Sequence, residues 1–215
     1  TLIKKFKYPK YGPGLMWEMA GEKIKKLSGK ITMGTSAKEF IYDESKKIWI
    51  VKCFNKINNL NITYECKRII CSAPLKDVVI NISPPLLSKP LAYKLKYRDF
   101  ITVAIMIDKR PAFDDNWIYI HDHDINAGRI QNYTSWSSHM APIDKGCLGL
   151  EYFCNEGENF WNKSDEKLKE IAIDDLNKLQ ILTNEKIIDT YVVRQKKAYP
   201  VYDQNYKEIV SRISN

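Results

Sequence analysis

Phe6-Lys7-Tyr8-Pro9-Lys10-Tyr11-Gly12-Pro13-Gly14-Leu15-Met16-Trp17-Glu18 is the stretch that decides how this chain is interpreted. It follows strand-like, basic opening residues and runs through a Gly-Pro-Gly turn into a predicted helix. Pro13 has the fixed φ that suits the first turn of a helix, and the two glycines let the backbone approach another group closely. The stretch therefore predicts a strand, a tight turn and a helix, with several aromatic rings around the turn.

The composition is that of a folded domain. The chain has 215 residues, of which 44% are hydrophobic, so it is long enough for one large domain or two small lobes. No run of eighteen apolar residues occurs, so no transmembrane segment is expected. Five cysteines without a Cys-x-x-Cys pair favour reduced thiols over a disulfide framework or a zinc site, which is typical of a cytoplasmic protein.

The net charge of +8 has two readings. The lysines attract an anionic ligand, such as a nucleotide diphosphate or a membrane surface, or they only solvate exposed faces. Because the basic residues are spread over the chain instead of forming one patch, nucleic-acid binding is not expected.

Hydrophobic periodicity predicts an α+β fold with antiparallel or mixed sheets and segregated helices. One helix is expected over 13–28, with its apolar residues on one face, and the clearest helix over 164–182, with Ser164 as its N-cap. A last helix follows Asp203, and a short one is expected within 86–97. Strands are expected at 30–33, 39–42, 48–54, 62–65, 68–71, 100–108, 116–121, 129–135, 148–154 and 187–195. Ser83-Pro84-Pro85 predicts a boundary between residues 1–83 and 84–215.

The turn at residues 8–18 resembles a "YPKxGPGxMWE" segment of the FAD-dependent amine-oxidase and protoporphyrinogen-oxidase superfamily, in its UDP-galactopyranose mutase-like branch. Three further stretches are similar to segments of that family: Ile69 to Leu75, Asn132 to Pro142, and Tyr199 to Tyr202. The first of these is equally consistent with an ordinary strand and turn. In the second, Tyr133 and Trp136 depart from the family pattern. The resemblance implies FAD as the cofactor and an α+β substrate-binding architecture.

The Gly-x-Gly-x-x-Gly turn with which that family holds the FAD pyrophosphate does not occur here. The resemblance therefore implies an internal piece of a larger flavoprotein, with the missing FAD-binding segments as its partner. Such a piece is expected to bind FAD weakly or not at all by itself. Residues 1–83 would adjoin the FAD domain, and residues 84–215 would form the substrate-binding lobe.

The resemblance also gives candidate site residues, each with a plainer alternative. Aromatic rings at the turn line a cavity or pack the helix; Arg129 pairs with a phosphate or forms an ion pair; the last tyrosines contact substrate, or Pro200 only ends a strand. The substrate-binding candidates are Tyr8, Tyr11, Trp17, Arg129, Trp136, Arg194, Tyr199 and Tyr202. The cofactor-binding candidates are Gly12, Gly14, Ser72 and Pro74.

The sequence leaves the catalytic residues unknown, and no metal site is expected. Flavin chemistry is done by the cofactor, and no Gly-x-Ser-x-Gly motif is present. His121 and His123 share a strand face, but two ligands do not make a zinc site.

Three functions follow from these observations. The first is the substrate-binding part of a UDP-galactopyranose mutase-like enzyme of surface polysaccharide (LPS) synthesis, acting on a nucleotide sugar or another small molecule. The second is part of an amine or protoporphyrinogen-type flavin oxidase. The third is a non-enzymatic module that binds carbohydrate or protein.

Overall fold

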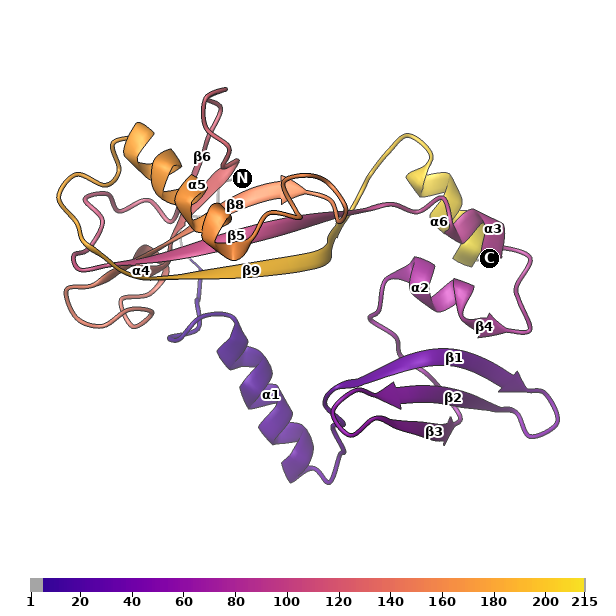
Figure 1. Cartoon of the computed structure of the whole chain (residues 1–215). Helices are drawn as coiled ribbons and strands as arrows, with labels where there is room; N and C mark the ends of the chain where they lie inside the picture. The colour runs from indigo at the N-terminus through magenta and orange to yellow at the C-terminus, as the bar shows by residue number, and fades with distance from the viewer. Residues whose placement is uncertain (1–5, 215) are drawn as a thin grey trace. The chain divides into compact units, whose positions relative to one another are not determined.

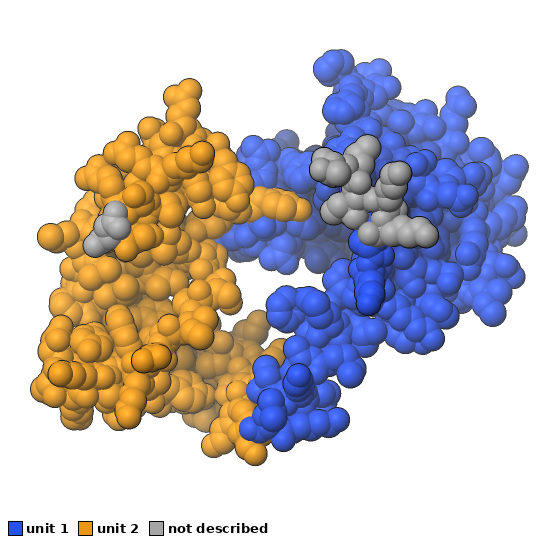
Figure 2. Space-filling view, turned by 180° about the vertical axis from the view of Figure 1, so that it is seen from behind, with its two compact units in different colours: residues 1–27, 98–198 blue, residues 28–97, 199–215 orange. Residues whose placement is uncertain are grey.

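The computed structural model describes residues 6–214 and shows the expected α+β fold, with two sheets and separate helices (Figure 1). The strand expected at the start of the chain lies outside the described residues. The chain divides into two compact units (Figure 2). Unit 1 contains residues 1–27 and 98–198, and unit 2 contains residues 28–97 and 199–215. The sequence instead suggested a break after Ser83; as a division into functional lobes, that boundary stays a prediction.

Unit 1 is built on a five-stranded sheet with the order β6-β7-β8-β5-β9. Pairing is antiparallel along β6, β7, β8 and β5, and Arg129 of β7 lies opposite Glu151 of β8. These strands fall close to the predicted ones. Their bounds are β5 (Tyr97–Ile107), β6 (Trp117–Tyr119), β7 (Arg129–Asn132), β8 (Gly146–Cys154) and β9 (Ile187–Pro200).

One face of this sheet forms the main hydrophobic core with α5 (Asp165–Lys178), which lies across it in Figure 1. Every second residue of β5 is buried, as expected for a strand with one face in a core. The Ser164 side chain accepts a hydrogen bond from the Lys167 amide at 3.2 Å, so the predicted N-cap is confirmed. Leu168, Ala172 and Leu176 are fully buried on the inner side of the helix.

Unit 2 contains a four-stranded sheet with the order β3-β2-β1-β4. The first three strands form an antiparallel meander, and β4 pairs with β1 in parallel, so the sheet is mixed. The strand bounds are β1 (Thr35–Asp43), β2 (Ile48–Asn55), β3 (Leu60–Cys66) and β4 (Ile82–Ser83).

Three helices complete unit 2: α2 (Leu75–Ile80), α3 (Lys89–Ala92) and α6 (Tyr206–Ser214). The Lys76 ammonium donates to the carbonyls of Tyr93 and Leu95, both at 3.3 Å, which ties α2 to the segment after α3. Asp203 accepts a hydrogen bond from the Asn205 amide at 3.1 Å just before α6, close to the expected start of the last helix.

Three local predictions were wrong. Residues 30–33 and 68–71 form no strand, and Ile70 is fully exposed. No described strand pairs with either segment, so their apolar residues had no sheet to join. The predicted strand 129–135 ends at Asn132, because Tyr133–Trp136 turns into the short helix α4.

The predicted first helix is confirmed as α1 (Gly14–Lys26), but its apolar face is not buried. Met16, Ile24 and Leu27 are exposed, and α1 has no buried residue. The spacing of apolar residues therefore predicted the helix correctly, while the residues of that face stay largely exposed.

Candidate functional site

The candidate site lies on the face of the unit 1 sheet opposite α5, which we call the outer face. Side chains alternate along a strand, so the residues between the buried ones point to this face. The strand register places them in cross-strand rows. The polar and aromatic members on these strands include Phe100, Thr102, Trp117, Tyr119, Arg129, Gln131, Glu151 and Phe153.

An ion pair occupies the middle of the outer face. Both Nε and Nη2 of Arg129 donate to Oε2 of Glu151, the former at 2.8 Å, and Gln131 donates to Oε1 at 2.9 Å. The side chains of Arg129 and Glu151 are only 18% and 7% exposed. The Arg129 guanidinium also lies 5.8 Å from the centre of the Tyr119 ring. The ion-pair alternative for Arg129 is thus what the structure shows, although the pair is sheltered and not on an open surface.

Helix α4 carries an aromatic cluster at one end of the outer face. The Trp136 ring lies 4.9 Å from the Trp117 ring, and its Nε1 donates to Oε1 of Gln131 at 2.9 Å. Because Gln131 also donates to Glu151, one chain of hydrogen bonds links Trp136 to the ion pair. The predicted site residues Trp136 and Arg129 therefore belong to one arrangement.

The segment before the Gly-Pro-Gly turn packs onto the same cluster. Tyr8 stacks on Trp136 with ring centres 5.0 Å apart, and its hydroxyl lies 3.7 Å from the sulfur of Met140. The Tyr11 ring lies edge-on to His139 at 5.9 Å. Burial raises the pKa of Tyr8 above its ordinary value. Both tyrosines thus reach the 136–140 region, which combines two stretches that the sequence had singled out separately.

Gly12 serves the packing of this turn. Its φ of +88° lies in the region that favours glycine, and an added Cβ would lie 3.2 Å from Cε of Met140. Gly14 has open space around it and begins α1. Gly12 therefore faces a methionine side chain, and cofactor binding by Gly12 and Gly14 stays a prediction.

Tyr133 lies against the backbone of Gly149 on β8. A Cβ at Gly149 would lie 2.5 Å from the Tyr133 hydroxyl, so only glycine allows this approach. Burial, with a smaller contribution from Cys147, raises the pKa of Tyr133 to about 12. The phenol therefore keeps its proton near neutral pH and can donate a hydrogen bond there.

We expect Gly149→Ala to destabilise unit 1 by about 1–3 kcal/mol, because the Tyr133 ring must move or leave its place. Gly14→Ala is the matched control: nothing lies within 4 Å of its added Cβ, and alanine favours a helix. Chemical denaturation of both variants measures the difference. Equal stabilities for the two would contradict the close packing of Tyr133 on Gly149.

The absorbance of tyrosinate tests the Tyr133 environment. We expect the titration of the wild type minus that of Tyr133→Phe to show one group with a midpoint of about 12. Unfolding returns the phenol to an ordinary pKa near 10, so between these values only the folded state holds the proton. Tyr133 then lowers stability as the pH rises from 10 to 12. A difference curve centred near 10 would show an exposed phenol.

Two predicted residues of unit 1 lie away from the outer face. Trp17 is 70% exposed on α1. Arg194 of β9 holds the start of α5: it pairs with Asp165 at 2.5 Å and donates to the Lys163 carbonyl at 2.7 Å. These contacts give Arg194 a structural task, and a substrate contact by either residue stays a prediction.

The remaining predicted residues lie in unit 2. Tyr199 and Tyr202 are exposed, and Tyr202 packs edge-on to Tyr206 at 4.8 Å. Ser72 and Pro74 precede α2. Residues Cys71 and Ala73 of this small-residue segment line a hollow of about 520 Å³ together with parts of β1, β2 and α2. The segment therefore leaves room for a ligand group, although Ser72 and Pro74 do not themselves line the hollow.

Three features of the site escaped sequence reasoning: Gln131, Glu151 and the packing of Tyr133 on Gly149. Arg129 and Gln131 alternate on one strand, and Glu151 interrupts an apolar strand. A charged residue inside an apolar strand is the signal in the sequence that could have indicated a sheltered ion-pair partner.

Within residues 6–214, no cluster of His, Cys, Asp or Glu is arranged to hold a metal ion. The same residues contain no helix with the length and apolarity needed to cross a membrane.

Solved structures of flavoenzymes share this architecture. Reduced UDP-galactopyranose mutase matches with a TM-score of 0.77 over 95% of this chain at 15% identity. A protein from Exiguobacterium sp. 255-15 that is assigned as a protoporphyrinogen oxidase matches with a TM-score of 0.70 over 91% of the chain, also at 15% identity. A triple mutant of putrescine oxidase gives 0.59 over 82% at 14% identity. The chain therefore has the fold of the corresponding region of FAD-dependent oxidoreductases and mutases.

This likeness confirms, at the level of the fold, the resemblance stated from the sequence. The chain spans 44%, 42% and 38% of the lengths of these three structures, respectively. No family model and no curated protein matches the sequence.

Proposed function

We propose that the chain is the substrate-binding region of an FAD-dependent, UDP-galactopyranose mutase-like enzyme of surface polysaccharide (LPS) synthesis, acting on a nucleotide sugar. One observation carries the proposal: a fold shared with that mutase bears an outer face on which aromatic rings adjoin a sheltered cation. The activity itself requires FAD-binding segments outside residues 1–215.

The free thiols of all five cysteines support a cytoplasmic location.

The outer face has the chemistry that a nucleotide sugar needs. Trp117 and Tyr119 are partly exposed and offer flat surfaces on which a base or sugar ring stacks. The Arg129 guanidinium, held by Glu151, lies beside the Tyr119 ring, and Tyr133 offers a phenol that stays protonated. The chain's +8 charge favours the approach of an anionic diphosphate.

FAD, when bound, would supply the redox-active ring, while the residues of this chain bind and orient the substrate. In unit 2 the hollow beside Cys71 and Ala73 fits part of the cofactor, because small side chains leave it open between β1 and α2. We expect the main contacts to the pyrophosphate to lie elsewhere, since residues 1–215 lack the Gly-x-Gly-x-x-Gly turn that holds it in the family that the sequence resembles. We therefore assign to unit 2 at most a contact with one end of FAD.

Titration of the chain with UDP-galactopyranose, followed by NMR of the tryptophan indole groups, tests the proposed substrate site. We expect the Trp136 and Trp117 signals to shift saturably, because the Trp136 indole donates into the hydrogen-bond chain that ends at Arg129. Trp136→Phe should weaken binding about ten-fold or more, as removal of an aromatic anchor does. Trp161→Phe, in the core beneath α5, should leave the affinity unchanged. Shifts confined to unit 2, or equal affinities of the two variants, would overturn the assignment.

A further inference from the structure

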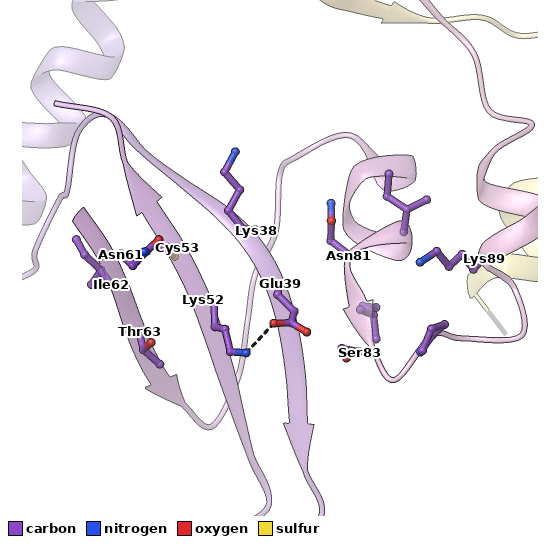
Figure 3. Close-up of a pocket in the computed structure, with 13 residues that line it drawn as sticks. Lys38, Glu39, Lys52, Cys53, Asn61, Ile62, Thr63, Asn81, Ser83 and Lys89 are labelled. Carbon is purple, nitrogen blue, oxygen red and sulfur yellow. Dashed lines mark ion pairs between the residues drawn. The ribbon is translucent and has the colours of Figure 1, made fainter. Parts of the chain in front are cut away.

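Unit 2 contains a pocket of about 500 Å³ that neither the fold comparison nor the proposed substrate site accounts for. Its wall consists of residues from β1, β2 and β3 on one side and from the segment between the end of α2 and the start of α3 on the other (Figure 3). Its volume lies within the usual range for small-molecule sites, about 300–1,000 Å³. All of its lining residues belong to unit 2, so the pocket is separate from the outer face of unit 1.

The charges in this pocket are unequal. Three lysines line it, Lys38, Lys52 and Lys89, against a single carboxylate, that of Glu39. Lys52 pairs with Glu39 at 2.8 Å, drawn as a dashed line in Figure 3. Hydrogen bonds from Lys52 and then Ser83 hold the pKa of Glu39 below its usual value. The Glu39 carboxylate is therefore charged and already paired with Lys52. Two positive charges remain.

Within residues 6–214, neither Lys38 nor Lys89 forms an ion pair with a carboxylate. Lys89 is partly buried, and Figure 3 shows it extending from α3 toward Asn81. An ammonium group that lines a pocket without a carboxylate partner is a suitable contact for a bound anion. Thr63 and Asn61 on the opposite wall add a hydroxyl and an amide that can donate hydrogen bonds.

We propose that this pocket binds the phosphate or pyrophosphate group of a small molecule. Lys89 offers phosphate a compact positive charge that no carboxylate among residues 6–214 neutralises, and Lys38, whose side chain extends away from Lys89 in Figure 3, adds to the positive potential around the pocket. The concave wall and its uncharged donors favour a small ligand over an extended polymer. The proposal does not rest on the function proposed above, because it uses no residue of the outer face.

Titration of the chain with inorganic pyrophosphate, followed by amide NMR, tests the proposal. We expect saturable shifts at Lys38, Asn81 and Lys89. Lys89→Ala should weaken the affinity about ten-fold or more, the loss expected when one charge-assisted hydrogen bond is removed. Lys38→Ala, at an exposed position that does not endanger folding, should weaken it in the same direction. Lys94→Ala is the matched control: it removes the same charge from unit 2 but does not line the pocket.

Further titrations identify the source of the phosphate. A response to inorganic phosphate equal to that of pyrophosphate would assign the pocket to a single phosphate, and a stronger response to UDP than to pyrophosphate would assign it to a nucleotide. Both results support the proposal. Equal losses in Lys38→Ala, Lys89→Ala and Lys94→Ala, or shifts spread over lysines throughout the chain, would show unspecific attraction to a basic protein and would overturn it.

Discussion

Asp175→Ala is expected to destabilise unit 1 by about 3–5 kcal/mol, because it removes a buried carboxylate that accepts several hydrogen bonds. Asp175 is fully buried in α5. Its Oδ1 accepts from the Asn126 backbone amide and side chain, both at 3.2 Å, and its Oδ2 accepts from the Ala127 amide and the Tyr152 hydroxyl, both at 3.1 Å. Alanine leaves these donors without a partner, at about 1–3 kcal/mol for each donor that stays buried.

Asp174→Ala is the matched control, because it removes the neighbouring carboxylate on the same helix. Asp174 is exposed and pairs with Lys178 in the next turn, so its loss should change stability little. Urea unfolding followed by tryptophan fluorescence compares the two variants. Tyr152→Phe, which removes one of the four hydrogen bonds, should give an intermediate loss. Similar midpoints for Asp175→Ala and Asp174→Ala would show that Asp175 does not hold the 126–127 turn to α5.

Glu151→Ala is expected to cost about 3–5 kcal/mol and to disturb the candidate site at the same time. Without the carboxylate, the sheltered Arg129 guanidinium keeps its charge but loses its partner, which is the situation that makes breaking a buried pair expensive. Gln131 also loses an acceptor, so the hydrogen bond from Trp136 becomes less well held. Trp136 fluorescence should therefore change together with stability.

A double-mutant cycle with Arg129→Ala separates the ion pair from general damage. The double variant should be less destabilised than the sum of the two single variants, because neither charge is then left unpaired. Glu156→Ala removes a carboxylate from an exposed pair with Lys196 and is the control. Additive losses in the cycle would mean that the two side chains do not interact across β7 and β8.

The sequence predicted most of the fold where its signals are local. Ser164 caps α5 as its position suggested, and the alternation along residues 100–108 appears as β5 with one buried face. These patterns depend on neighbours within one turn or one strand. Residues 68–71 show the limit: apolar, β-branched residues suggest a strand, but a strand forms only where a partner strand is available.

The candidate site was predicted in pieces. The sequence singled out Tyr8, Arg129 and Trp136 but gave no means of joining them. Their association depends on the strand register that places Arg129 opposite Glu151. It also depends on the packing of Tyr8, which precedes the Gly-Pro-Gly turn, against Trp136. Arg129 and Glu151 are 22 positions apart, and Tyr8 and Trp136 more than a hundred, so no local pattern encodes either contact. Arg194 was singled out in the same way, yet in the structure it holds the start of α5.

The central claim is that this fold serves a flavin-dependent mutase. Its most direct test is made on the polypeptide that carries residues 1–215 together with flavin-binding segments: a flavin spectrum, reduction with dithionite, and a search for the furanose product after addition of UDP-galactopyranose. We predict bound flavin and furanose formed without net oxidation, with a large loss of product in Trp136→Phe. Bound flavin with no product would contradict the mutase and favour an oxidase of the amine or protoporphyrinogen type. A polypeptide without flavin would contradict the flavoenzyme itself and favour a non-enzymatic module that binds carbohydrate or protein.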